Sequence, residues 1–314
     1  QQRMGIGDMI IFLPYIHAIS KKFQSKVSLL VKKNSKAEDL CLDDTHIGEI
    51  INLDINKDSS SNHNGWSGFF RLLSKIKEKK FDKIFIFNSS IKYLLLAKLA
   101  GIKSINQYPL FLRKNNIVLT ARELIQNSIQ ENISTQPVLH LSRDKIEKAK
   151  NKYKFDSSFR HICFGFSASG PTKRWPIEKY MKLAENMNKI KPCKFYLAGG
   201  RNDEELFTKF LNSSIASNCI SFKDLSISET LPIIKNCDMY IGNDTGWLHI
   251  ASALGKKCVA LFMDSPVQAY GKYSENISVI VPEGETEETT THDTLGKDKI
   301  NFEKVLNKSL ETLG

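Results

Sequence analysis

The sequence predicts an α/β protein made of two successive doubly wound domains, in which helices cover both faces of a parallel sheet. Short apolar runs, such as 161–166, 194–198 and 256–262, alternate with helix-length segments along the chain. Beyond their first residues these runs are almost wholly apolar, which is typical of strands buried on both faces of a parallel sheet. Loops of glycine, small and charged residues follow several runs, as expected where ligands bind at strand ends.

The length of 314 residues also favours two domains. We expect the first over residues 1–157 and the second over 158–314, because the polar run 142–158 is typical of an interdomain connection. The last helix, over 302–313, is expected to pack at the domain junction.

The clearest strand, turn and helix lie between residues 239 and 254. The apolar run 239–241 breaks at Gly242, and an Asn-Asp-Thr-Gly turn leads into apolar residues at helical spacing. Asp244 or Thr245 suits the helix N-cap, and Gly246 lets backbone N–H groups approach a ligand. These N–H groups and the positive end of the helix dipole predict a phosphate site.

Two further loops of the second domain carry candidate ligand-binding residues. After the run 161–166, small residues lead to Lys173 and Arg174 just before a helix, and two cations in that position are suited to gripping a diphosphate. Acids follow the run 194–198, and one of them is placed to hold a ribose diol. The helix dipole explains three consecutive acids equally well. These acids are Asp203, Glu204 and Glu205.

The N-terminal residues form a glycine turn ahead of an apolar helix over 9–19. Gly5 and Gly7 permit close backbone approach, and Asp8 is expected at the N-cap of that helix. On capping statistics alone, a purely capping role is favoured for Asp8. A turn of this kind normally follows a buried strand, so we expect that residues upstream of Gln1 supply one.

Cysteine usage and hydropathy indicate the cellular compartment of the protein. The six cysteines are scattered singly, with no spacing suited to zinc, and we expect reduced, mostly buried thiols in a cytosolic protein. No apolar run approaches the ~18 residues that cross a bilayer, and we expect no signal peptide. We expect a soluble or peripheral protein.

Charge is concentrated in the first half of the chain. The net charge is +11, of which residues 1–150 carry +10 and residues 151–314 carry +1. This favours a polyanionic partner, whether nucleic acid, an anionic membrane or an acidic lipid-sugar, although solvated lysines explain it equally well. The segment 62–80 mixes aromatic and basic residues; it suits a membrane surface, but a helix covering the sheet is favoured.

Taken together, 5–8, 173–176, 198–200 and 242–251 resemble the lipopolysaccharide heptosyltransferases, glycosyltransferase family 9. The resemblance implies a GT-B fold, in which two Rossmann-like domains face a cleft. The N-terminal domain would bind the acceptor, and the C-terminal domain would bind the nucleotide sugar, usually ADP-heptose. It also implies an inverting transfer with no metal and no further cofactor.

The resemblance also assigns roles to individual residues. Asp8 matches the general base and Lys173 the phosphate-binding lysine, with Arg174 as a second cation beside it. One of the three acids at 203–205 would hold the ribose. Trp247 replaces the smaller residue usual in the family, which bears on the donor sugar pocket. The donor loop would comprise Asp244, Thr245, Gly246 and His249.

The implied function is transfer of a heptose to a lipid-linked acidic glycan, either lipid A-Kdo or a heptose of the lipopolysaccharide core. The enzyme would be cytoplasmic and peripheral on the inner-membrane surface. One alternative is another nucleotide sugar, such as an N-acetylhexosamine, used on a different glycan. A nicotinamide-dependent oxidoreductase is disfavoured because no G-x-G-x-x-G follows a strand with an acid ~20 residues later. Nucleic acid is not expected as a partner, because aromatics lie among cations only near 66–80.

Overall fold

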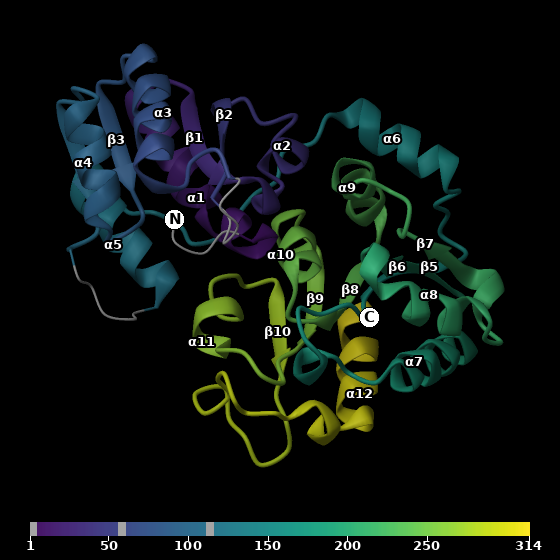
Figure 1. Cartoon of the computed structure of the whole chain (residues 1–314). Coiled ribbons are helices and arrows are strands. Elements are labelled where there is room, and N and C mark those ends of the chain that lie inside the picture. The colour runs from purple at the N-terminus through teal and green to yellow at the C-terminus, as the bar shows by residue number, and fades with distance from the viewer. Residues whose placement is uncertain (1–4, 56–60, 111–115) are drawn as a thin grey trace. The chain divides into compact units, whose positions relative to one another are not determined.

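The computed structural model describes residues 5–55, 61–110 and 116–314, and the chain divides into two compact units (Figure 1). Unit 1 comprises residues 1–38 and 45–135, and unit 2 comprises residues 39–44 and 136–314. Residues 136–157, which our boundary places in the first domain, belong to unit 2 because helix α6 (Arg143–Lys152) packs against helix α9 (Ile227–Asn236).

Unit 1 contains two pairs of parallel strands. Strand β1 (Val27–Lys32) pairs with β2 (Ile47–Leu53), and β3 (Lys83–Ile86) pairs with β4 (Ser104–Gln107). Helices α3 and α4 enclose an apolar core with β2 and β3, in which Phe69, Leu72 and Leu96 are buried. The other elements of this part of the chain are α1 (Ile6–Phe23), the short α2 (Ala37–Leu40), α3 (Gly65–Glu78), α4 (Ile91–Leu99) and α5 (Ile117–Ile129).

Unit 2 is built on a six-stranded, fully parallel sheet in the order β10-β9-β8-β5-β6-β7. The first strand of the unit, β5, therefore lies in the middle, and the chain continues outward from it on both sides. The strands are β5 (Arg160–Gly165), β6 (Cys193–Ala198), β7 (Cys219–Ser221), β8 (Met239–Asn243), β9 (Lys257–Leu261) and β10 (Ile277–Ile280). The remaining helices are α7 (Ile177–Ile190), α8 (Glu204–Leu211), α10 (Gly246–Ala253), α11 (Val267–Tyr270) and α12 (Phe302–Leu313).

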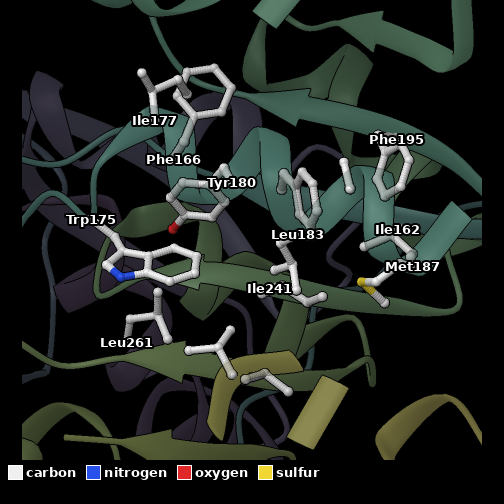
Figure 2. Packing of buried hydrophobic residues seen from close by; sticks show 14 of the residues in the cluster. Ile162, Phe166, Trp175, Ile177, Tyr180, Leu183, Met187, Phe195, Ile241 and Leu261 are labelled. Atoms are coloured by element: carbon white, nitrogen blue, oxygen red, sulfur yellow. The ribbon is translucent and has the colours of Figure 1, made fainter. Parts of the chain in front are cut away.

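The core of unit 2 lies between the sheet and the helices α7 and α12 (Figure 2). The Tyr180 ring of α7 lies against Trp175 with ring centroids 5.0 Å apart, and Leu183 of α7 and Ile241 of β8 belong to the same fully buried cluster. Trp175, just ahead of α7, is also fully buried and stacks on Phe302 of α12 with ring centroids 6.2 Å apart. The loop before α7 is therefore anchored by the core as well as by its backbone.

Glycine is required where two central strands meet. Gly165 of β5 and Gly242 of β8 are register partners, and the Tyr240 ring lies against both. A Cβ added at Gly165 would lie 1.9 Å from the Tyr240 hydroxyl oxygen, and one added at Gly242 would lie 2.5 Å from the Gly165 carbonyl oxygen. The Tyr240 hydroxyl donates to the Asn243 carbonyl at 3.1 Å, so this ring has a fixed position at the strand ends.

We predict that Gly165→Ala lowers the free energy of unfolding by about 2 kcal/mol, because the added methyl group overpacks a closed core. Gly170→Ala is the control, since nothing lies within 4 Å of a Cβ there. Urea unfolding followed by tryptophan fluorescence measures both variants. Equal stability of the two variants would contradict the packing argument.

Candidate active site

The carboxyl ends of the unit 2 strands bring the predicted donor residues to one edge of the sheet. Because all six strands are parallel, the loops that follow them emerge at the same edge. Lys173 lies in the loop after β5, Asp203 in the loop after β6, and Asp244 directly after β8. Strands β5 and β8 are neighbours, and the chain leaves them toward opposite sides of the sheet. A ligand site is expected at such a switch point.

The side chain of Asn243 joins the loops at this edge. It is fully buried, and its amide nitrogen donates to the Phe166 and Ser167 carbonyls at 2.8 and 3.2 Å. Its amide oxygen accepts from the Trp175 backbone N–H at 3.2 Å and from the Tyr180 hydroxyl at 2.9 Å. Four hydrogen bonds thus fix the end of β8 against both ends of the loop that carries Lys173. The sequence analysis did not single out Asn243, although it directly precedes the predicted turn.

The helix after β8 begins as the sequence predicts. Of the two predicted N-caps, Thr245 is the cap: its hydroxyl accepts from the Trp247 N–H at 3.3 Å. Asp244 is not the cap and instead lies against His249, with Oδ1 3.5 Å from Nε2. The other ring nitrogen of His249 is hydrogen-bonded to the Tyr273 hydroxyl at 2.6 Å. The buried contacts of His249 with Asp244 and Tyr273 therefore stabilise the first turn of α10.

Asp244 is ionised at neutral pH despite its burial. Burial alone would raise the pKa of Asp244, but the interaction with His249 and the positive charge of Lys173 lower the pKa below its ordinary value. The loop that carries Lys173 follows β5, and α10 follows the neighbouring strand β8, so the predicted phosphate lysine and the predicted phosphate-binding helix terminus lie at the same edge of the unit 2 sheet.

A second carboxylate near Lys173 was missed by the sequence analysis. Asp264 follows β9 and accepts a hydrogen bond from the Thr172 hydroxyl at 2.7 Å. Burial tends to raise the pKa of Asp264, but the bond from Thr172, two backbone bonds and the charge of Lys173 hold the pKa below its ordinary value. The signal that could have found Asp264 is an acid just beyond a strand end, the same signal that singled out 203–205.

Two predicted ligand-binding residues are paired with each other. The Arg174 guanidinium lies 3.1 Å from Asp203 Oδ1, and Asp203 Oδ2 accepts the Gly200 backbone N–H at 2.9 Å. The pair ties the loop after β5 to the loop after β6, so in this structure the Arg174 guanidinium faces a carboxylate.

The other two acids of this loop lie on the surface of α8. Glu204 pairs with Lys223, and Glu205 lies 3.4 Å from Lys209 one turn along the helix. Glu204 and Glu205 occupy the first turn of α8, where the helix dipole favours acids. The structure therefore separates the three acids into one buried loop residue and two surface residues, and a ribose role for any of them stays a prediction.

In unit 1, the N-terminal residues differ from the prediction in detail. Helix α1 begins at Ile6 with Gly5 as its N-cap, so the predicted N-cap position of Asp8 was wrong. Asp8 lies in the first turn, where Oδ2 accepts the Gly5 N–H at 2.9 Å. Gly7 lies inside the helix and not in a loop. The helix starts earlier because the Asp8 carboxylate reaches back to satisfy a terminal amide.

The prediction of unpaired, buried cysteines is confirmed. All six are free, five are buried, and the sixth, Cys219, is partly buried. Burial raises the thiol pKa in each case, for example to about 12 for Cys41 and to about 11 for Cys193. The thiols are therefore protonated at neutral pH and are poor nucleophiles.

Comparison with solved structures confirms the fold class. An Escherichia coli ADP-heptose lipopolysaccharide heptosyltransferase II matches with a TM-score of 0.76 at 20% identity, over 99% of this chain and 96% of that one. A family 9 glycosyltransferase from Veillonella parvula gives 0.79 at 18% identity over 99% and 95%. E. coli heptosyltransferase WaaC with ADP gives 0.74 at 14% identity over 98% and 97%. At these identities the likeness defines a GT-B architecture of two Rossmann-like domains.

Sequence comparison then identifies the family. The model of "Glycosyltransferase family 9 (heptosyltransferase)" matches residues 69–298, and the chain belongs to this family. Lipooligosaccharide heptosyltransferase 2 of Haemophilus influenzae is 26% identical over 202 residues, 60% of this chain and 56% of that protein. Lipopolysaccharide heptosyltransferase 2 of E. coli is 23% identical over 224 residues, 61% of this chain and 62% of that protein. The chain thus matches less than two thirds of the length of these relatives.

We predict that Asn243→Ala destabilises the protein by about 3 kcal/mol, because it leaves buried donors and carbonyls without partners. Tyr180→Phe is the matched control: it removes one of the four bonds of Asn243 and should cost about 1 kcal/mol. Chemical unfolding of both variants measures the difference. If the two variants lose the same free energy of unfolding, the four hydrogen bonds of Asn243 do not hold the loops of the site together.

Proposed function

We propose that this chain transfers a heptose from ADP-heptose to an acidic, lipid-linked acceptor of the lipopolysaccharide core, with inversion at the anomeric carbon and without a metal ion. The observation that carries the proposal is that the loop of Lys173 and the N-terminus of α10 follow the neighbouring parallel strands β5 and β8 at the switch point of unit 2. Family membership supports the reaction class. The relatives' names, lipooligosaccharide and lipopolysaccharide heptosyltransferase, support the sugar and the acceptor class.

In the donor half of the reaction, positive groups of the protein stabilise the negative charge of the departing ADP. Departure of ADP places negative charge on the β-phosphate, and a lysine with helix-terminal N–H groups stabilises such charge in place. Lys173 supplies the cation, and the start of α10 at Gly246 supplies the dipole. Asp244 and Asp264 hold the ammonium group by charge, and His249 fixes Asp244. In this proposal Lys173 performs the role that a divalent cation has in other nucleotide-sugar enzymes.

The acceptor half requires a base. In a single displacement the acceptor hydroxyl loses its proton as it attacks the anomeric carbon, and we assign this proton to Asp8. The hydrogen bond to Gly5 N–H engages Oδ2 and fixes the rotamer of the carboxylate. The capping role weighed for Asp8 and the catalytic role are thus compatible, because a carboxylate has two oxygens.

A second candidate donor is another nucleotide sugar, such as an N-acetylhexosamine nucleotide. The observation that favours it is Trp247 in the donor loop, whose ring lies 6.1 Å from the ring of Phe222. A large aromatic side chain at this position changes the shape available to the transferred sugar. The two donors share the phosphate site and differ only in the sugar pocket.

We predict that ADP and ADP-heptose bind to the protein with unchanged affinity in EDTA, and that Lys173→Ala weakens ADP binding at least about tenfold through loss of a charge-assisted contact. Isothermal titration calorimetry measures each constant. Lys189→Ala, on the exposed face of α7, is the charge-matched control. Loss of binding in EDTA would exclude metal independence. Uptake of a different nucleotide sugar, with no binding of ADP-heptose, would replace heptose by the second candidate.

We predict that Asp8→Asn lowers the transfer rate by about a hundredfold or more, because the amide cannot accept the acceptor proton. The amide oxygen can still accept from Gly5 N–H, so the start of α1 and the binding of ADP should not change. A coupled assay of ADP release and calorimetry separate the two effects. A variant that retains the wild-type rate would remove Asp8 from the role of base.

We also place the protein in the cytoplasm, on the inner-membrane surface, where a lipid-linked acceptor is presented. No helix within the described ranges has the length and apolarity to cross a membrane. Helix α3 buries Phe69, Leu72 and Ile76 in the core, as favoured by the sequence, yet leaves Trp66 and Phe70 74% and 58% exposed. These two rings lie one turn apart on a helix rich in exposed lysines, which suits an interface of anionic lipids.

We predict that the protein co-sediments with vesicles containing anionic lipid, and that changing Trp66 and Phe70 together to alanine weakens this binding about tenfold. The variant loses apolar area that would be buried in the lipid interface. Ile190→Ala is the control, because Ile190 is 63% exposed but lies in unit 2. Equal binding of the double variant and the control would exclude α3 as the membrane contact.

A further inference from the structure

The loop that carries Lys173 is tied to two other loops, one on each side of that lysine. Thr172, directly before Lys173, donates its hydroxyl to Asp264 Oδ2 at 2.7 Å. Arg174, directly after it, donates from its guanidinium to Asp203 Oδ1 at 3.1 Å. Asp264 follows β9 and Asp203 lies between β6 and α8, so the two carboxylates come from opposite sides of β5, the strand that leads into the loop. Lys173 therefore lies between two anchored neighbours.

Both carboxylates are fixed in the same way. The second oxygen of Asp264, Oδ1, accepts the Leu295 backbone N–H at 3.1 Å, and that of Asp203, Oδ2, accepts the Gly200 backbone N–H at 2.9 Å. Asp264 is 8% exposed and Asp203 is 9% exposed. A buried carboxylate that is bonded through both oxygens keeps one rotamer, which is the property required of a group that orients another residue.

Lys173 has no such tie on its side chain. Its backbone N–H donates to the Gly170 carbonyl at 3.2 Å, which closes the short 3-10 turn Pro171–Lys173. The side chain is partly exposed, and within the described ranges of the chain no ion pair or hydrogen bond engages Nζ. Because Asp203 neutralises Arg174, Lys173 is the cation of this loop that is available to an anion.

We infer that Asp203 and Asp264 are positioning residues for Lys173. By holding Arg174 and Thr172, they fix the chain on both sides of the lysine and present its ammonium group to the diphosphate of the donor. We identify that ligand from the proposed function, on which this inference rests. Position matters at such a site, because a displacement of about 1 Å can cost about a hundredfold in rate.

Asp203 thereby has a role different from the predicted one. The sequence predicts that one of the acids at 203–205 holds the ribose. Both oxygens of Asp203 already bind groups of the protein, and Arg174 would lose its partner if the carboxylate turned toward a ribose. Asp203 therefore acts on the phosphate end of the donor, through Arg174 and Lys173, and not on the ribose.

The bond between Thr172 and Asp264 is tested with two substitutions of Thr172. Thr172→Val removes the hydroxyl at nearly constant shape, and Thr172→Ser keeps it. ADP binding is measured by isothermal titration calorimetry for each variant, in the wild-type chain and in Lys173→Ala. We expect Thr172→Val to weaken binding about fivefold in the wild-type chain, because a displaced ammonium group keeps part of its attraction for phosphate. Thr172→Ser should restore the wild-type affinity.

The Lys173→Ala background separates positioning from other effects. If Thr172 and Asp264 act through Lys173, Thr172→Val weakens ADP binding no further once the ammonium group is gone. The same loss in both backgrounds, or a loss in Thr172→Ser as large as in Thr172→Val, would overturn the proposal. Thr172 is partly exposed, so both variants are expected to fold.

The role of Asp203 is tested with Asp203→Asn in the same two backgrounds. The amide has one acceptor oxygen, so it cannot replace both carboxylate oxygens that bind Arg174 and Gly200. We expect a loss of ADP affinity of about fivefold in the wild-type chain that disappears in Lys173→Ala. A loss that persists in Lys173→Ala would mean that Asp203 binds the ribose directly, which contradicts the positioning role.

Inorganic pyrophosphate, which has no ribose, is the second ligand of this series. We expect the same pattern of losses as with ADP, because the two carboxylates act on the phosphate contact. That pattern with pyrophosphate, in a protein that does not bind ADP, would support the positioning of Lys173 and count against ADP-heptose as the donor. Losses that do not depend on Lys173, with either ligand, would exclude the positioning role whatever the donor sugar.

Discussion

The loops at the carboxyl edge of the unit 2 sheet depend on one buried amide. Asn243 ends the central strand β8 and holds the loop after β5 through bonds to the Phe166 and Ser167 carbonyls and to the Trp175 N–H. A buried amide that satisfies all of its partners is worth more than the sum of its bonds, because any partial arrangement leaves an unpaired group. These hydrogen bonds of Asn243 hold the loop that carries Lys173 beside the end of β8, from which α10 begins.

Charge at the same edge is arranged in pairs. Arg174 pairs with Asp203, and Asp244 pairs with His249. The positive charge of Lys173 helps to lower the pKa of both Asp244 and Asp264. Carboxylates with lowered pKa values remain ionised at neutral pH and keep the cation in place. Charges fixed by their neighbours in this way would need little reorganisation to bind the proposed diphosphate, which is the condition for strong electrostatic stabilisation.

Unit 1 is also built from parallel strands and helices, with a different balance of exposed groups. Its helix α3 covers the core with one face and presents Trp66 and Phe70 with another. Its central helix α1 is buried over most of its length and carries Asp8 in its first turn. The base proposed on a buried helix and the lipid contact proposed on an exposed one would suit an acceptor that is partly lipid and partly sugar.

The sequence by itself determined the α/β class, the strand and helix order, the glycine turn at 242–246 and the family, because these depend on local hydrophobic period and on short motifs. Tertiary structure alone decided the pairing of Arg174 with Asp203, the role of Asn243 and the start of α1, because each depends on partners distant in sequence or on competition for a terminal amide. Sequence patterns show which side chains can bind a group, whereas only packing decides whether a neighbour already occupies them.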